Sequence, residues 1–203
     1  MEKMRKIGVT GGVGAGKSLV LSYLENAHGA RIIMLDEVGR ELMEPSGACF
    51  QPVADLFGQE VVQPDGTLDR PLIAKKMLAD EELRLKLNGI IHPAVLHETM
   101  RRIYRAEDEG VRILVVESAI LLETNYDAIC DEVWYIYADA RVRAARLKES
   151  RGYDDARIKK TMEAQLTDEE FRKRADHVID NSGDFERTKA QIDGILAQDG
   201  VFG

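Results

Sequence analysis

Residues 11–18 read Gly11-Gly12-Val13-Gly14-Ala15-Gly16-Lys17-Ser18 and directly follow the apolar run Ile7-Gly8-Val9-Thr10. They match the phosphate-binding loop pattern G-x-x-x-x-G-K-[ST], in the context that this pattern requires, between a strand and a helix. The glycines allow successive backbone N–H groups to converge on phosphate oxygens. Lys17 is then expected to reach the β- and γ-phosphates, and the Ser18 hydroxyl to bind the Mg²⁺ that bridges them. This context favours a nucleoside triphosphate site over a glycine-rich turn beside an exposed lysine.

The composition narrows the class of protein. The chain has 203 residues, which is enough for one main core with a small insertion or lid. Its formal net charge of -8 is too acidic for a typical nucleic-acid-binding surface. Cys49 and Cys130 lie far apart without metal-ligand spacing, so we expect neither a disulfide framework nor a zinc site. The N-terminus lacks a long apolar signal segment, and no run approaches membrane-spanning length. We therefore expect a cytoplasmic protein with no membrane partner.

The pattern of apolar residues predicts an open α/β sheet. Strands are expected at 5–10, 30–35, 112–116, 132–137 and 177–180. Helices are expected at 16–26, 37–43, 48–57, 72–78, 81–91, 94–106, 139–150, 154–164, 168–174 and 185–197. His92-Pro93 is expected to separate two of these helices, and Trp134 to pack in the core. The mostly helical chain between the second and third strands is too long for one crossover helix, which predicts an inserted substrate-binding region.

Asp36 follows the second predicted strand at its carboxyl end, which in a doubly wound parallel sheet lies at the same edge as the phosphate loop. A carboxylate there can accept the proton of an acceptor hydroxyl during phosphoryl transfer. The alternative is that Asp36 caps the helix beginning at Glu37. Arg40, four residues further on, either orients that carboxylate or holds substrate, or it forms an ordinary surface ion pair.

A basic helix follows the fourth predicted strand. Arg143, Arg146 and Arg151 either close over the phosphates as a lid or form a solvated helix face, since a guanidinium makes forked contacts with phosphate oxygens. Glu117, at the end of the third strand, either helps to position the metal or pairs with Lys17. By itself His92 is interpreted as structural, because it precedes a proline at an expected helix break. The chain lacks an Asn-Lys-x-Asp guanine signature, and these residues together favour phosphoryl transfer to a small acceptor.

Taken in order, the motifs resemble those of the dephospho-coenzyme A kinase family, transferases that use ATP to phosphorylate the ribose 3′-hydroxyl of dephospho-CoA in the last step of coenzyme A biosynthesis. The similarity extends from about Lys6 to Gly183. Beyond the phosphate loop it is carried by Asp36 with Arg40, Glu44-Pro45, Phe57-Gly58, Asp65-Gly66-Thr67-Leu68-Asp69-Arg70, His92-Pro93, 117–123, 146–151, Gln165 and Ala175-Asp176-His177-Val178-Ile179-Asp180-Asn181.

The resemblance implies a three-layer P-loop kinase fold of the nucleoside and nucleotide kinase-like group, with a five-stranded parallel sheet, a helical substrate-binding insertion and a helical lid. The nucleotide-binding core is expected at 1–59, 107–142 and 166–203, the helical CoA (acceptor) domain at 60–106 and the lid at 143–165. It implies Asp36, Lys17 and Arg146 as catalytic residues and Ser18 as the metal ligand. ATP is expected to contact 11–18, Arg143, Arg151 and Asn181, and dephospho-CoA to contact Arg40, Arg70, His92 and Glu117.

The chain departs from the family pattern at two places. The usual Asp-Ala-Asp after the second strand is here Met34-Leu35-Asp36, so only the second acid can serve as base. The usual Asp-x-Pro-Leu-Leu-x-Glu is here Glu117-Ser118-Ala119-Ile120-Leu121-Leu122-Glu123, with glutamate in the first position and no proline. A monomer without a nucleic-acid partner is expected. The rival functions are a P-loop kinase of another small hydroxyl or nucleotide acceptor, and a nucleotide-dependent protein switch.

Overall fold

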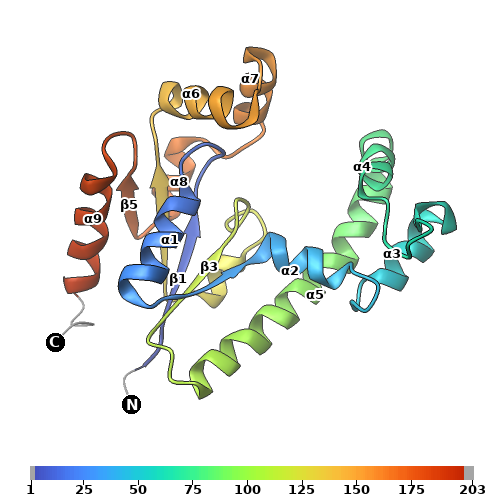
Figure 1. Ribbon diagram of the computed structural model, residues 1–203, viewed down its shortest axis with the longest axis horizontal. Helices are drawn as coiled ribbons and strands as arrows, with labels where there is room; N and C mark the ends of the chain where they lie inside the picture. The colour runs from blue at the N-terminus through green and yellow to red at the C-terminus, as the bar shows by residue number, and fades with distance from the viewer. Residues whose placement is uncertain (1–2, 199–203) are drawn as a thin grey trace. The chain divides into compact units, whose positions relative to one another are not determined.

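The structure is a computed structural model in which residues 3–198 are described. The chain divides into two compact units (Figure 1). One comprises the described residues up to Ile32 and from Gly110 onward, and the other is Ile33–Glu109. The helical unit therefore begins before the expected acceptor domain at 60–106 and includes residues 33–59, which were expected in the nucleotide-binding core. Residues 1–2 and 199–203 of that expected core lie outside the described residues.

Five strands form one sheet in the order β2-β3-β1-β4-β5, which confirms the expected α/β fold class. The strands are β1 (Arg5–Thr10), β2 (Arg31–Met34), β3 (Ile113–Glu117), β4 (Glu132–Tyr137) and β5 (His177–Asp180). The pairings of β1 with β3, of β1 with β4 and of β4 with β5 are parallel. Val9 lies opposite both Glu117 and Trp134, so β1 leads into the phosphate loop at the edge where β3 and β4 also end.

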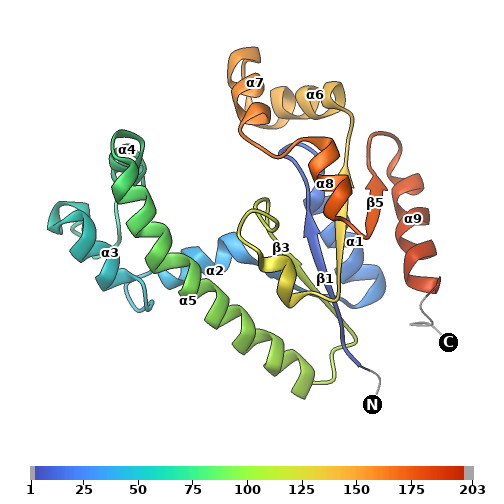
Figure 2. The ribbon, with the colours of Figure 1, turned by 180° about the vertical axis from the view of Figure 1, so that it is seen from behind.

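Helices cover both faces of this sheet. Helices α1 (Lys17–His28) and α9 (Phe185–Gln198) pack on one face, where Trp134 is fully buried in the core, as expected. On the opposite face lie α8 (Asp168–Arg174) and the 3₁₀ helix η2 (Tyr126–Ile129), and Phe171 stacks on Tyr135 with ring centroids 4.6 Å apart. Figure 2 shows α8 from that side. The expected lid at 143–165 contains most of α6 (Ala140–Arg151) and all of α7 (Asp155–Glu163).

The second unit is helical around its own core. Its elements are α2 (Leu35–Leu42), α3 (Phe50–Phe57), the 3₁₀ helix η1 (Gln59–Val61), α4 (Arg70–Ala79) and α5 (Glu81–Asp108). Val53, Phe57, Ile73 and Leu87 are among the residues that pack between these helices. An antiparallel bridge between Val62 and Leu68 closes the turn that contains Pro64-Asp65-Gly66.

Helix α5 overturns the expected break at His92-Pro93. It continues as one helix from Glu81 to Asp108 with Pro93 in its interior. A proline there removes one backbone hydrogen bond and costs about 3 kcal/mol, which is why the dipeptide predicts a break. The helix persists because α2, α3 and α4 pack along it on both sides of the proline: Leu87 is buried before it and Val95 after it.

Candidate active site

The phosphate loop has the backbone conformation that its glycines permit. Gly14 and Gly16 have φ values of 83° and 88°, in the left-handed region, and Gly16 directly precedes α1. The Ala15 N–H donates to the Gly12 carbonyl at 3.1 Å, which closes a turn within the loop. A loop that wraps back onto a helix N-terminus presents backbone N–H groups and the positive end of the helix dipole to an anion.

Lys17 and Glu117 meet beside this loop. The Lys17 ammonium donates to the Gly11 carbonyl at 2.8 Å and lies 3.6 Å from a Glu117 carboxylate oxygen. Glu117 is buried at the end of β3, with a residue exposure of 6%. Of the two interpretations left open by the sequence, the pairing with Lys17 is present in the structure.

Two arginines of the expected lid contact the loop backbone. Arg146 donates to the Ala15 carbonyl at 3.2 Å and to the Asn181 carbonyl at 2.8 Å. Arg143 donates from Nε to the Val13 carbonyl at 2.9 Å. Both side chains are half-buried, so the alternative of a solvated helix face is wrong for them.

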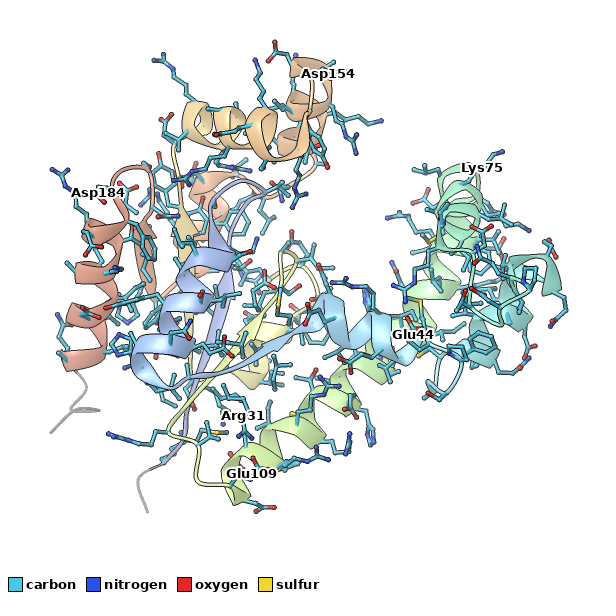
Figure 3. The ribbon with its side chains drawn as sticks, in the orientation of Figure 1. Arg31, Glu44, Lys75, Glu109, Asp154 and Asp184 are labelled. Carbon is cyan, nitrogen blue, oxygen red and sulfur yellow. The ribbon has the colours of Figure 1, made fainter. Side chains whose placement is uncertain are left out.

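Arg151 is in a different environment. It is the exposed last residue of α6, and its hydrogen bond to Tyr153 lowers the pKa of that phenol. Asp154, labelled in Figure 3, follows directly and caps α7 by accepting from the Arg157 N–H. Of the three arginines, Arg143 and Arg146 are thus the two that the structure brings onto the phosphate loop.

Asn181 secures the same loop from the end of β5. It is buried, with an exposure of 1%, and its amide nitrogen donates to the Ala15 carbonyl at 2.8 Å. Its amide oxygen accepts from the Thr188 hydroxyl at 3.0 Å, and its backbone N–H donates to the Tyr137 carbonyl. Both ends of the amide group are therefore engaged inside the protein.

Asp36 lies in the first turn of α2 and is exposed. The residue preceding the helix is Met34, and no side chain caps it, so the interpretation of Asp36 as a helix cap is wrong. Arg40 donates from Nε to the Asp36 backbone carbonyl at 3.3 Å, and its Nη2 lies 3.9 Å from Glu37. The carboxylate of Asp36 contributes negative charge near a helix N-terminus, where it is stabilised.

Arg70 lies beside the C-terminal end of α2. It donates to the Arg40 carbonyl at 3.1 Å and pairs with Glu44 at 2.8 Å (Figure 3 labels Glu44). Arg40 and Arg70, both expected to bind the acceptor, are thus neighbours within the helical unit. His92 is half-buried inside α5.

A metal site made of protein ligands alone is absent from residues 3–198, where no three His, Cys, Asp or Glu side chains cluster to hold an ion. Mg²⁺ at nucleotide sites generally binds through one or two protein groups together with waters and phosphates, so it does not require such a cluster. Ser18, exposed in the first turn of α1, has the hydroxyl that such an ion takes.

Gln165 contacts the phosphate loop and Arg143, and no motif spacing in the sequence predicts these contacts. Its amide oxygen accepts from the Val13 N–H at 3.1 Å and from Arg143 at 2.8 Å. In the sequence only the family resemblance points to Gln165, because it lies 152 positions from Val13 and no local pattern connects them.

The chain is similar to several known proteins in sequence and in fold. The family model described as "CoaE: Dephospho-CoA kinase" matches residues 5–187. A dephospho-CoA kinase of Corynebacterium glutamicum is 36% identical over 195 residues, covering 96% of this chain and 97% of that protein. A crystal structure of a Thermus thermophilus protein is similar with a TM-score of 0.83 and 27% identity, covering 97% of this chain and 98% of the other. A dephospho-CoA kinase structure from Campylobacter jejuni shares the fold, with a TM-score of 0.71, 16% identity and 97% coverage of both chains. Within residues 3–198, no helix is both long and apolar enough to cross a membrane.

Proposed function

This chain belongs to the dephospho-CoA kinase family, and we propose that it transfers the γ-phosphoryl group of ATP to the ribose 3′-hydroxyl of dephospho-CoA, forming CoA and ADP. The observation that carries the proposal is the family match over residues 5–187, which includes the glycine loop and the lid that contacts it. A phosphate loop alone is shared by many functions, so the acceptor is assigned by the family and the donor by the loop.

On the donor side, the loop amides and Lys17 hold the triphosphate, and Arg143 and Arg146 supply positive charge from the lid. Because these positive groups are already oriented, little reorganisation of the protein is needed when negative charge spreads over the transferred phosphoryl group. Arg151, at the exposed end of α6, is a further candidate for the triphosphate. Asn181 supports nucleotide binding by holding the Ala15 carbonyl in place.

The Ser18 hydroxyl would help to hold Mg²⁺, which would supply positive charge beside the phosphates. The buried carboxylate of Glu117 lies 3.6 Å from the Lys17 ammonium, and this attraction holds the ammonium beside the loop. Substrate phosphates would compete with Glu117 for Lys17. We therefore propose that the contact between Glu117 and Lys17 changes when the substrates bind.

On the acceptor side, Asp36 is the proposed general base for the 3′-hydroxyl. Its exposed carboxylate is accessible to a ligand, and the Arg40 side chain donates a hydrogen bond to the Asp36 backbone carbonyl. Arg40 and Arg70 provide guanidinium groups for the phosphates of dephospho-CoA, and His92 is a further contact. We also propose a cytoplasmic monomer without a nucleic-acid partner, which the net charge of -8 supports.

The activity is tested by incubating the purified protein with ATP, Mg²⁺ and dephospho-CoA and measuring ADP and CoA by chromatography. Adenosine and a nucleoside monophosphate serve as parallel acceptors. We expect turnover with dephospho-CoA to exceed that with either alternative. Equal or faster turnover with another acceptor would overturn the assigned substrate. Slow ATP hydrolysis that dephospho-CoA does not change would indicate a nucleotide-dependent switch instead.

The role of Asp36 is tested by Asp36→Asn. Loss of a positioned general base should lower kcat by about 10²- to 10⁴-fold while ATP binding is retained. Glu37→Gln is the matched control, because it neutralises the adjacent exposed carboxylate in the same helical turn. Normal turnover by Asp36→Asn, or an equal loss in both variants, would contradict the assignment.

A further inference from the structure

The tip of the phosphate loop is held through both polar groups of Val13. Its N–H donates to the Gln165 side-chain oxygen at 3.1 Å, and its carbonyl accepts from Arg143 Nε at 2.9 Å. Gln165 and Arg143 are themselves joined, because Arg143 Nη2 donates to the same Gln165 oxygen at 2.8 Å. The three contacts form a closed ring between lid and loop.

Gln165 is held in position by the chain on either side of it. Its backbone N–H donates to the Met162 carbonyl at 3.3 Å, in the turn that ends α7. Two residues later, Thr167 caps the N-terminus of α8 in a capping box with Glu170. A side chain between two fixed helix ends loses little further freedom when it binds, which suits it to orienting another group.

Arg143 lies directly against the loop. A Cβ built on Gly12 would come within 2.2 Å of Arg143 Nη2, so only glycine allows the guanidinium to approach so closely. Burial lowers the pKa of Arg143 from its usual value, although a guanidinium remains charged at neutral pH. Among residues 3–198, Nε and Nη2 have hydrogen-bond partners and Nη1 has none. Nη1 is therefore available to donate to a phosphate oxygen.

Glutamine at position 165 provides a neutral hydrogen-bond acceptor, its side-chain amide oxygen. An amide oxygen orients Arg143 without cancelling its charge, whereas a carboxylate in the same place would form an ion pair and add negative charge beside the phosphate loop. We propose that Gln165 is a positioning residue that holds Val13 and directs a fully charged Arg143 towards the nucleotide phosphates. This inference rests on the proposed use of the loop for ATP and is independent of the acceptor.

The test compares Gln165→Glu and Gln165→Met by isothermal titration with ADP and with inorganic tripolyphosphate, without any acceptor. Gln165→Glu keeps an oxygen for Val13 and Arg143, so we expect an unchanged or raised melting temperature and about tenfold weaker binding. Gln165→Met removes the acceptor while keeping the side-chain length, and we expect weakening of about threefold. In turnover assays each of the two substitutions should raise the KM for ATP more than it lowers kcat, and should leave the KM for dephospho-CoA unchanged.

Gln51→Glu is the matched control, since it adds the same charge on the exposed surface of α3 in the helical unit, and its binding should equal that of the wild type. A merely structural role predicts that Gln165→Glu binds as well as the wild type, and that result would overturn the proposal. Wild-type binding by Gln165→Met would likewise overturn it. If the wild-type protein binds ADP but does not phosphorylate dephospho-CoA, the assigned acceptor fails while this inference is still tested by the binding data.

Discussion

Gly16 shows how one residue serves both the backbone and a neighbouring side chain. Its left-handed φ of 88° favours glycine, and a Cβ built there would lie 2.3 Å from the Asn181 amide nitrogen. The loop motif explains the first requirement from the sequence. The second depends on β5 arriving beside the loop, so only the folded chain reveals it.

We expect Gly16→Ala to lower the free energy of unfolding by about 2–3 kcal/mol, because the strained backbone and the displaced Asn181 both contribute. Gly29→Ala is the matched control: Gly29 also has a left-handed φ, of 65°, but nothing lies within 4 Å of its Cβ position. That variant should lose only about 1 kcal/mol. Urea denaturation measures both, and equal losses would show that the contact with Asn181 is unimportant.

Glu98 illustrates the effect of charge within the helical unit. Hydrogen bonding to Arg101 is the main cause that lowers the pKa of Glu98 from its usual 4.5 to about 2, and Arg102 contributes further. Arg102 also pairs with Glu41, which connects α5 to α2. Because the folded pKa lies below the unfolded value, this interaction stabilises the protein above about pH 4.5 and its contribution is lost as the pH falls towards 2.

Glu98→Gln should therefore reduce the free energy of unfolding by about 2 kcal/mol at pH 7, after allowance for the solvent exposure of Arg101. The difference from the wild type should shrink as the pH falls from 4.5 towards 2 in denaturation experiments. Glu82→Gln is the control on the same helix, since its ion pair with Lys86 is exposed and should contribute much less to the free energy of unfolding. A pH-independent loss would contradict the assignment to Glu98.

Among the elements, α5 departs most from its sequence pattern. The cost of Pro93 is local, whereas the burial of Leu87, Val95 and Ile103 is spread along the whole helix and favours continuation. Each of these side chains contributes on the order of 1.5–3 kcal/mol when buried, so the packing outweighs one missing hydrogen bond.

Replacing the exposed Pro93 by alanine should stabilise the helical unit. The variant regains a helical N–H and loses a rigid residue in the unfolded chain, for a net gain of about 1–2 kcal/mol in the free energy of unfolding. Urea denaturation and the KM for dephospho-CoA should be measured together, because His92 is the adjacent residue. Destabilisation by Pro93→Ala would show that the proline ring packs favourably where it stands.

Helix α6 shows the opposite case, in which the sequence predicted the element well and tertiary structure decided its role. Asp139 caps it by accepting from the Arg141 N–H, and Gly152 ends it with a left-handed φ of 62°, so its bounds follow from ordinary local signals. Which of its arginines face the phosphate loop depended on how the helix packs. Arg143 and Arg146 contact loop carbonyls, whereas Arg151 contacts Tyr153.

At the scale of the molecule, a parallel sheet core and a helical unit are built from separate hydrophobic clusters. The β-strands were predictable because continuous apolar runs are typical of strands buried on both faces. The extent of the helical unit was not predictable from the sequence, because the helical patterns within residues 35–57 are the same whichever unit those helices belong to. The packing of α2 and α3 against α5 assigns them to Ile33–Glu109.

The sequence by itself determined the phosphate loop, the α/β class, the order of strands and helices along the chain and, through the ordered motifs, the family. These properties depend on residues that are neighbours in the chain, where backbone freedom and apolar period act directly. The tertiary structure decided that α5 is continuous, that Asp36 is not a helix cap, and that Asn181 and Gln165 hold the loop at Ala15 and Val13. Those contacts join residues more than 150 positions apart, and no local interaction energy specifies them.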